Sequence, residues 1–168
     1  GGRKNNEDSI SWNQLIKSTN DMSQSVRLGI VADGVGGHNK GEIASSVAIS
    51  AINDSISKSL NDPFRTNVFS PKEHLEILKK AYHNGNNAVY KLARKGEYSG
   101  MATTAVSVYL WEEEGGSAGF IIGNVGDSRG YLINRNEITQ VTKDDSEVQK
   151  LVDSGEITER EARTHLRK

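Results

Sequence analysis

The chain has 168 residues, with 21 basic and 22 acidic side chains and a formal net charge of -1. This balance gives no strong attraction to nucleic acid or to an anionic membrane surface, and no apolar run approaches the ~20 residues that cross a bilayer. The absence of cysteine excludes disulfides, thiolate metal sites and phosphatase chemistry built on a cysteine nucleophile. No secretory signal is visible, so we expect a cytoplasmic protein whose length suits one domain.

The first half of the chain predicts one buried strand followed by two helices. Residues 1–10 are too polar for a firm strand prediction, but Arg3, Asn5, Glu7 and Ser9 would share one face if the segment is extended. Residues 26–32 form an apolar, β-branched run that ends abruptly in the glycine-rich turn 33–37, as a buried strand does. Apolar side chains at helical spacing begin after Glu42 and continue to Ile56, which predicts the first helix.

The second helix has a clear predicted start after the loop 61–69. Ser70 can cap it, Pro71 suits its first turn, and Glu73 completes a capping box three residues after the cap. Apolar residues at helical spacing then continue until Gly96. These features predict a long amphipathic helix.

The second half of the chain predicts short strands and two short helices. Alternating apolar residues predict a strand at 104–110, and residues 112–117 suit a hairpin loop. Three further strands are expected, at 119–125, 130–133 and 138–141. Helical spacing resumes at 146–154, and Thr158 with Glu161 forms a second capping box. Antiparallel-looking strands interrupted by two long helices favour an α+β fold over a parallel α/β sheet.

Acidic side chains occur at three places of interest. Glu7 and Asp8 lie in the polar first segment, Asp33 follows the predicted strand 26–32, and Asp127 follows the predicted strand 119–125. A carboxylate just past a buried strand is rigidly held yet exposed, which suits a hard cation with oxygen ligands. The glycines after Asp33 also let backbone carbonyls approach the same ion. Arg3 could hold a phosphate through its planar guanidinium.

Each of these signals also has a plain structural alternative. Asp33 could do no more than cap its turn, and Glu7 with Asp8 could be a solvated pair. Asp127 could belong to a structural turn with a local ion pair, and Arg3 could be a surface charge. The residues alone leave these alternatives open.

Other motifs fail on spacing. The glycine-rich stretch 34–41 has neither the ending of a nucleotide phosphate loop nor the spacing of a dinucleotide fold. Four scattered histidines without an H-E-x-x-H motif argue against zinc.

Five segments taken in order resemble the type 2C metal-dependent serine/threonine protein phosphatases, particularly their bacterial-type members. They are RKNNEDS at 3–9, VADGVGGH at 31–38 with Gly41 and Glu42, GMATT at 100–104, NVGDSRGYL at 124–132, and TKDDS at 142–146 with matches as far as His165. The second and fourth segments are individually strong, and the set covers nearly the whole chain.

The resemblance implies a β-sandwich of two antiparallel sheets with helices on both outer faces. It also implies a centre of two Mn²⁺ or Mg²⁺ ions, with a third, weaker ion in many members. By motif, Asp33 bridges the two ions and Gly34 adds its carbonyl. Glu7 binds the second ion with Asp8 in support, and Asp127 binds the third.

The implied activity is hydrolysis of phosphoserine and phosphothreonine in proteins by an activated water, with Arg3 binding the substrate phosphate. The expected partners are phosphorylated proteins, among them a serine/threonine kinase or its targets. Residues 144–168 resemble the start of the flap beside the active site of this family.

Three departures accompany the resemblance. Val35 stands where eukaryotic relatives carry a histidine proposed as general acid, and Ala102 stands where the family usually has glycine. The family's last strands, with two further metal-binding aspartates, do not occur within residues 1–168. We therefore expect a partial catalytic domain, incomplete at both ends, with weak or no activity by itself.

Two other functions are considered beside the leading one. The first is a non-catalytic relative that serves as a binding or regulatory module. The second is a sporulation-type phosphatase that acts on one dedicated phosphoserine protein. Metal binding by the intact protein distinguishes the first alternative from an enzyme.

Overall fold

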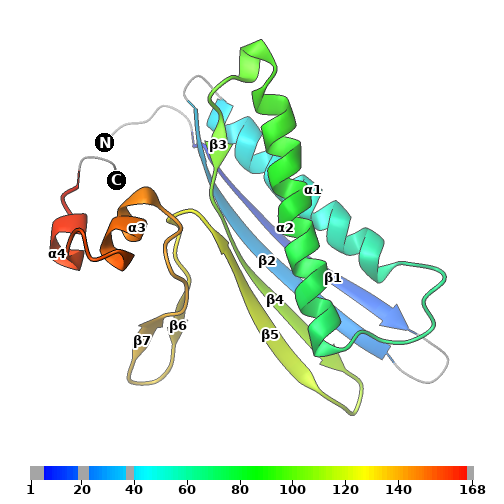
Figure 1. Cartoon of the computed structure of the whole chain (residues 1–168). Coiled ribbons are helices and arrows are strands. Elements are labelled where there is room, and N and C mark those ends of the chain that lie inside the picture. The colour runs from blue at the N-terminus through cyan, green and yellow to red at the C-terminus, as the bar shows by residue number, and fades with distance from the viewer. Residues whose placement is uncertain (1–5, 19–22, 37–39, 166–168) are drawn as a thin grey trace.

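A computed structural model describes residues 6–18, 23–36 and 40–165 of the chain. Its main element is a five-stranded antiparallel sheet with two long helices against one face (Figure 1). The strands lie in the order β1 (Asp8–Ser18), β2 (Ser23–Val35), β4 (Ala105–Glu113) and β5 (Ala118–Val125), and β3 (Ala102–Thr103) pairs with the end of β2. The two helices are α1 (Lys40–Leu60) and α2 (Pro71–Ala93).

The remaining elements lie beside this sheet (Figure 1). A short 3-10 helix, η1 (Gly96–Tyr98), follows α2. After β5 come the hairpin β6 (Tyr131–Ile133) and β7 (Ile138–Gln140), and then α3 (Glu147–Asp153) and α4 (Glu159–Ala162). The predicted α+β class with antiparallel sheets is confirmed.

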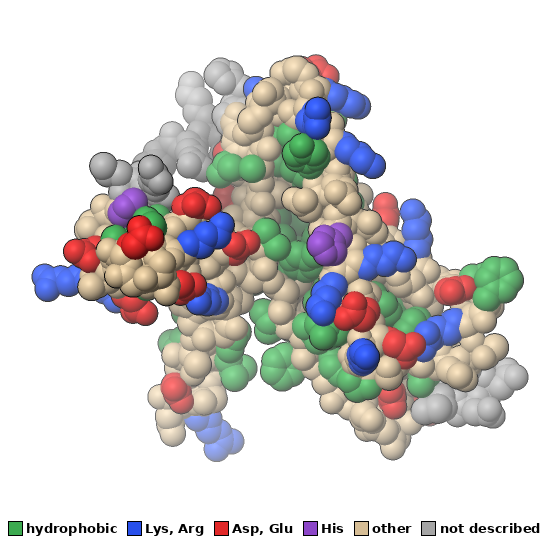
Figure 2. All heavy atoms as spheres, in the orientation of Figure 1, with side chains coloured by type: hydrophobic (Ala, Val, Ile, Leu, Met, Phe, Trp, Pro, Cys, Tyr) green, Lys and Arg blue, Asp and Glu red, His purple; other side chains and the backbone are tan. Residues whose placement is uncertain are grey.

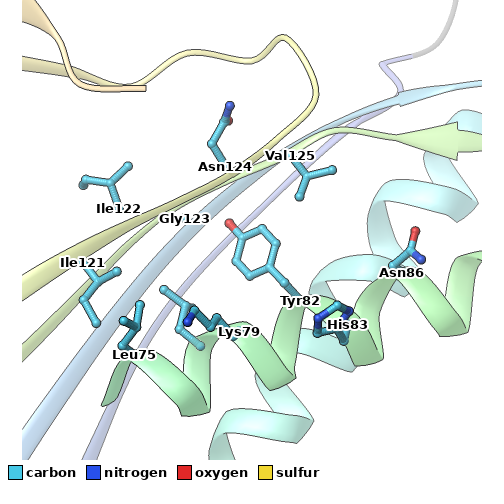
Figure 3. Close-up of a pocket in the computed structure, with 11 residues that line it drawn as sticks. Leu75, Lys79, Tyr82, His83, Asn86, Ile121, Ile122, Gly123, Asn124 and Val125 are labelled. Carbon is cyan, nitrogen blue, oxygen red and sulfur yellow. The ribbon is translucent and has the colours of Figure 1, made fainter. Parts of the chain in front are cut away.

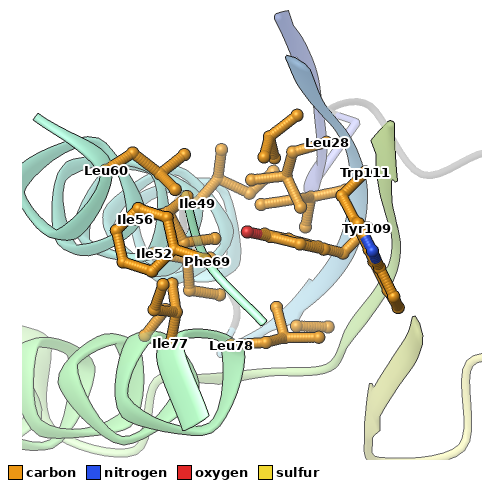
Figure 4. Packing of buried hydrophobic residues seen from close by; sticks show 14 of the residues in the cluster. Leu28, Ile49, Ile52, Ile56, Leu60, Phe69, Ile77, Leu78, Tyr109 and Trp111 are labelled. Atoms are coloured by element: carbon orange, nitrogen blue, oxygen red, sulfur yellow. The ribbon is translucent and has the colours of Figure 1, made fainter. Parts of the chain in front are cut away.

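The core lies between the helices and one face of the sheet. Along β2 the even-numbered residues from Gln24 to Gly34 are all buried, which places them under α1 and α2. Leu28, Ile52, Ile56 and Tyr109 are among the largest fully buried side chains (Figure 4). Because strand side chains alternate, the odd-numbered residues of β2 point to the opposite face.

That opposite face carries apolar side chains that no helix covers within the described part of the chain. Ile10, Trp12 and Phe120 remain 78%, 63% and 59% exposed. A gap of about 640 Å³ separates this face from the β6–β7 hairpin. Figure 2 shows hydrophobic side chains on both sides of the gap.

The helix boundaries follow their predicted signals. Ser70 accepts a hydrogen bond from the backbone N–H of Glu73, whose side chain accepts one from the Ser70 N–H, so the capping box of α2 is formed. The hydrogen bonds from Ser70 lower the pKa of Glu73 to about 2. The box of Thr158 and Glu161 is also formed. No helix in the described ranges is long and apolar enough to cross a membrane.

The first strand was not predicted, because residues 1–10 read as polar. In β1, side chains alternate between exposed and half-buried, and none is fully buried. A strand whose inner face is only partly covered gives a weak hydrophobic period. The strand predicted at 26–32 also extends further, to 23–35, because residues 23–33 pair with β1 and residues 34–35 pair with β3.

A buried histidine lies at the end of the core nearest the start of α2. His74 is fully buried, shares a 2.8 Å hydrogen bond with the Tyr109 hydroxyl, and stacks on Trp111 with ring centroids 4.9 Å apart. Its Nε2 atom has no hydrogen-bond partner in the part of the chain the structure describes. Burial lowers the pKa of His74 to about 4.

This histidine predicts acid sensitivity. Between pH 6.5 and about 4 the unfolded state binds a proton at His74 that the folded state does not, so stability falls as the pH falls through that window. We expect a loss of about 3 kcal/mol in the free energy of unfolding, measured by urea unfolding at pH 7 to 4. His74→Gln should flatten this dependence, whereas His83→Gln, at an exposed site on the same helix, should not. Equal pH dependence in all three proteins would contradict the assignment.

Candidate metal centre

Two carboxylates face each other where β1 begins and β2 ends. Asp8 pairs with Asp33 in the antiparallel register of the two strands. Residues opposite each other in such a pair project to the same face, with Cβ atoms about 4.5–5.5 Å apart. Both residues are exposed, on the sheet face away from α1 and α2. The register thus pairs Asp8, rather than Glu7, with Asp33.

Backbone contacts fix the segment that precedes Asp8. The carbonyl oxygen of Glu7 accepts hydrogen bonds from the Gly34 N–H at 3.2 Å and from the Ser45 hydroxyl at 2.7 Å. Ser45 belongs to α1 and is fully buried. The start of β1 is therefore held between the end of β2 and the first turns of α1.

Gly34 is packed directly against the backbone of Gly41 at the start of α1. A Cβ on Gly34 would overlap the Gly41 carbonyl group, and a Cβ on Gly41 would lie 2.8 Å from the Glu7 carboxyl carbon. Both positions therefore require glycine. This close approach brings the Glu7 side chain beside the first turn of α1, where acidic side chains are favoured by the helix dipole.

Thr104 connects Asp33 to the turn that carries Asp127. Its hydroxyl accepts a hydrogen bond from the Asp33 N–H at 3.1 Å and lies 2.6 Å from the Ser128 hydroxyl. Its own N–H donates to the Asp33 carbonyl at 2.9 Å. The turn also packs closely, because a Cβ on Gly126 would lie 2.7 Å from the Thr104 methyl group. Asp127 therefore immediately precedes Ser128, which is linked to Asp33 through the hydroxyl of Thr104.

A second segment closes over this turn from the other side. Arg129 donates two hydrogen bonds of 2.8 Å to the two carboxylate oxygens of Asp144. The Asp145 N–H donates to the Gly126 carbonyl at 2.8 Å. Asp127 and Arg129 line a groove of about 480 Å³ whose other wall comes from α3 and α4. Figure 2 shows acidic and basic side chains mixed over this part of the surface.

The predicted site residues are placed unequally. Asp8, Asp33 and Gly34 lie together, Glu7 joins them through its backbone, and Asp127 is connected through Thr104. Arg3 lies outside the described residues. Within residues 6–18, 23–36 and 40–165, no three acidic or histidine side chains form a group that could hold a metal ion. The structure therefore supplies a carboxylate pair and a nearby third acid.

Sequence reasoning assigned no role to Thr104, Ser128 or Asp144, although all three lie within the quoted motifs. Their contribution is through hydrogen bonds between distant segments, which residue spacing does not reveal. The local ion pair considered for the Asp127 turn is formed instead by Arg129 with a residue 15 positions away.

A separate pocket of about 360 Å³ lies between α2 and the edge strand β5. Leu75, Ile121 and Val125 give it apolar walls, and the ring of Tyr82 lies against Gly123 (Figure 3). The Tyr82 hydroxyl donates a hydrogen bond to Ser107 of β4 at 2.9 Å, so the ring packs across β5 as part of the core. The pocket includes none of the predicted site residues.

The donors at the Asp8–Asp33 pair suit a hard divalent ion. Carboxylate and backbone carbonyl oxygens are the ligands that Mg²⁺ and Mn²⁺ prefer. Two carboxylates on one face also repel each other unless a cation lies between them. Because Gly34 and Gly41 are in direct contact, neither position has room for a side chain that would block the Gly34 carbonyl oxygen. The residues present therefore fit such an ion, although they do not complete its ligand shell.

A sequence profile described as Protein phosphatase 2C matches residues 1–152. The chain belongs to the protein phosphatase 2C family.

Two relatives illustrate the similarity. The serine/threonine protein phosphatase PstP of Mycobacterium tuberculosis is 36% identical over 154 residues, which cover 90% of this chain and 27% of PstP. The serine/threonine phosphatase stp of Listeria monocytogenes is 34% identical over 140 residues, covering 83% of this chain and 51% of the relative. The chain thus spans about a quarter to a half of these relatives.

Solved structures agree. The serine/threonine phosphatase of S. agalactiae has a TM-score of 0.74 at 30% identity, covering 100% of this chain and 62% of that one. The catalytic domain of PstP in complex with two manganese ions has a TM-score of 0.65 at 34% identity, covering 96% and 59%. The fold expectation drawn from the family is therefore supported over the whole chain.

Gly34→Ala should destabilise the protein strongly, because the new methyl group must displace the backbone at the start of α1. We expect a loss of at least about 2 kcal/mol in the free energy of unfolding, measured by urea titration. Gly96→Ala is the matched control, since a Cβ there meets nothing within 4 Å. If the two variants were equally stable, the close approach of Gly34 and Gly41 would be disproved.

Thr104→Val removes the hydroxyl that joins Asp33 to Ser128 while keeping the shape of the side chain. We expect a loss of about 1 kcal/mol in stability and roughly tenfold weaker Mn²⁺ binding, measured by unfolding and by isothermal titration. Thr104→Ser keeps the hydroxyl and should bind Mn²⁺ nearly as the unmodified protein does. Unchanged affinity in the valine variant would show that this connection does not position the site.

Proposed function

We propose that the protein carrying this chain is a metal-dependent serine/threonine protein phosphatase, and that residues 1–168 form part of its catalytic domain. The observation that supports this most strongly is the pairing of Asp8 with Asp33 in a chain of the protein phosphatase 2C family. The manganese ions in the PstP structure support the same choice of cofactor.

In this proposal, Asp33 holds a divalent ion at the end of β2, and Asp8 supports it from the start of β1. Gly34 contributes its carbonyl oxygen, Glu7 binds a second ion from its place beside the first turn of α1, and Asp127 serves a further ion. Bound Mn²⁺ or Mg²⁺ supplies a water of lowered pKa and neutralises phosphoryl oxygens. Phosphate-ester hydrolysis depends mainly on such positioning and charge.

Two other residues bear on substrate binding and on the source of the proton for the leaving group. Arg3 binds the phosphate of a phosphoserine or phosphothreonine side chain through its planar guanidinium. Val35, at the end of β2, is aliphatic and 48% exposed. It cannot donate a proton to the leaving alkoxide, so solvent water supplies that proton. The substrates are phosphorylated proteins, including a serine/threonine kinase or its targets.

One observation favours a second candidate function. Among the described residues, no three acidic side chains are grouped to hold an ion. A protein whose complete site brought no third acid to the Asp8–Asp33 pair would bind phosphoproteins or other partners without turnover. Mn²⁺ binding and hydrolysis by the complete protein distinguish the two functions.

The proposal predicts the effects of removing each paired carboxylate. In the complete protein, with Mn²⁺ and a phosphothreonine peptide, Asp33→Asn should lower kcat/KM on the order of a thousandfold because an essential negative ligand is lost. Asp8→Asn should lower it roughly 10- to 100-fold, as expected for a supporting group. Both are measured by phosphate release.

Asp54→Asn is the matched control, because Asp54 is an exposed acid on α1, away from the pair. Its activity should stay within about twofold of the unmodified protein. Retention of more than a tenth of the activity by Asp33→Asn would refute the assigned role.

A further inference from the structure

The pairing of Arg129 with Asp144 is unlike the other ion pairs of the α3 region. It is bidentate, with both hydrogen bonds at 2.8 Å, and the Asp144 side chain is only 13% exposed. The pair of Lys150 with Glu147 is made by side chains that are 64% and 71% exposed. Bidentate guanidinium–carboxylate pairs in partly dry surroundings are stronger and more directional than exposed single contacts.

This ion pair lies within a junction of hydrogen bonds between two segments. On one side is the Asp127 turn, and on the other is the segment 141–145. The Asn124 amide donates to the Lys143 carbonyl at 3.0 Å, and the Gly130 N–H donates to the Thr142 hydroxyl at 2.9 Å. Together with the bond from Asp145 to Gly126, these contacts align the two segments.

The junction continues directly into α3. Ser146, two residues after Asp144, caps this helix by accepting a hydrogen bond from the Gln149 N–H. Lys143 also forms an ion pair of 2.7 Å with Asp153 at the other end of α3. The position of α3 therefore depends on how the segment 141–145 is attached.

α3 and α4 form one wall of the groove of about 480 Å³ that Asp127 and Arg129 line from the other side. A change in the attachment of 141–145 would consequently change both the width of this groove and the setting of the Asp127 carboxylate. The Arg129–Asp144 ion pair joins the Asp127 turn to the segment 141–145, so it affects both the groove width and the position of the Asp127 carboxylate.

We propose that Arg129 and Asp144 are positioning residues that lock the Asp127 turn to the α3–α4 segment. They thereby set the affinity of the Asp127 site for its ion and the shape of the adjoining groove. The consequences for turnover rest on the proposed phosphatase function, whereas the consequences for local order and metal binding do not.

The first test measures local order by amide hydrogen exchange in the complete protein without added metal. Arg129→Lys keeps the charge but loses the planar, two-pronged contact, and Asp144→Asn removes the negative charge. Each should speed exchange of the amides in 141–153 by about tenfold or more while α1 and α2 keep their rates. The charge-swapped protein, Arg129→Asp with Asp144→Arg, should recover part of the protection.

Arg27→Lys is the matched control, since Arg27 makes a single, exposed 3.4 Å contact with Glu112 on the main sheet. It should leave exchange in 141–153 unchanged. If Arg129→Lys and Asp144→Asn also leave these amides unchanged, or if they speed exchange equally throughout α1 and α2, the positioning role is overturned.

The second test counts and titrates bound Mn²⁺ by electron paramagnetic resonance. We expect Arg129→Lys to weaken the weakest-binding ion about tenfold and to leave the tighter binding within twofold. Unchanged affinity for every ion would overturn the proposed link to Asp127, whatever the activity of the protein.

Kinetics with a phosphothreonine peptide and with a small aryl phosphate complete the test. KM for the peptide should rise several-fold, and kcat for the aryl phosphate should change less, because the groove is used mainly by the larger substrate. An equal loss on both substrates would contradict a role in shaping the groove. If the unmodified protein hydrolyses neither substrate, the proposed function fails, but the exchange and Mn²⁺ experiments still decide the positioning role.

Discussion

The candidate centre depends on the register of β1 against β2. The two strands pair over eleven positions, from Asp8 with Asp33 to Ser18 with Ser23. A slip of one residue would turn every side chain of β1 to the other face. It would place Glu7 or Ser9 opposite Asp33 and direct Asp8 toward α1. Burial of β2 under the two helices fixes which of its residues face outward. The carboxylate pair therefore depends on this burial.

The backbone contacts at Gly34 and Thr104 convert this register into a fixed site. Gly34 touches the first turn of α1, so the end of β2, the start of β1 and the helix are held as one unit. Thr104 extends that unit to the Asp127 turn through its hydroxyl and backbone N–H. Segments that are far apart in sequence are thus joined by glycine contacts and short hydrogen bonds rather than by apolar packing.

Much of the fold could be predicted from the sequence because its signals are local. The capping boxes that open α2 and α4 depend on residues three positions apart, and both are formed. The short strands at 130–133 and 138–141 were also predicted, and the structure pairs them as the β6–β7 hairpin. By contrast, β1 was not predicted, because its side chains are only partly covered and its apolar period is weak.

The candidate site was harder to predict because its contacts join residues that are far apart in the sequence. Motif resemblance singled out Asp33 and Asp127, but residue spacing could not show that Thr104 links Asp33 to Ser128, the neighbour of Asp127. The bidentate contact of Arg129 with Asp144 also depends on tertiary packing. The sequence alone could not decide whether Glu7 or Asp8 lies opposite Asp33. The register of β1 against β2 shows that it is Asp8. The roles of these residues, and that of Arg3, remain predictions.

The most direct test of the account is to locate bound manganese by anomalous X-ray diffraction from crystals of the complete protein. We predict an ion between the first residue of β1 and the end of β2, about 2.0–2.4 Å from an Asp33 carboxylate oxygen, with the Asp8 side chain facing it. Strong anomalous density elsewhere in the molecule, with none beside Asp33, would contradict the account.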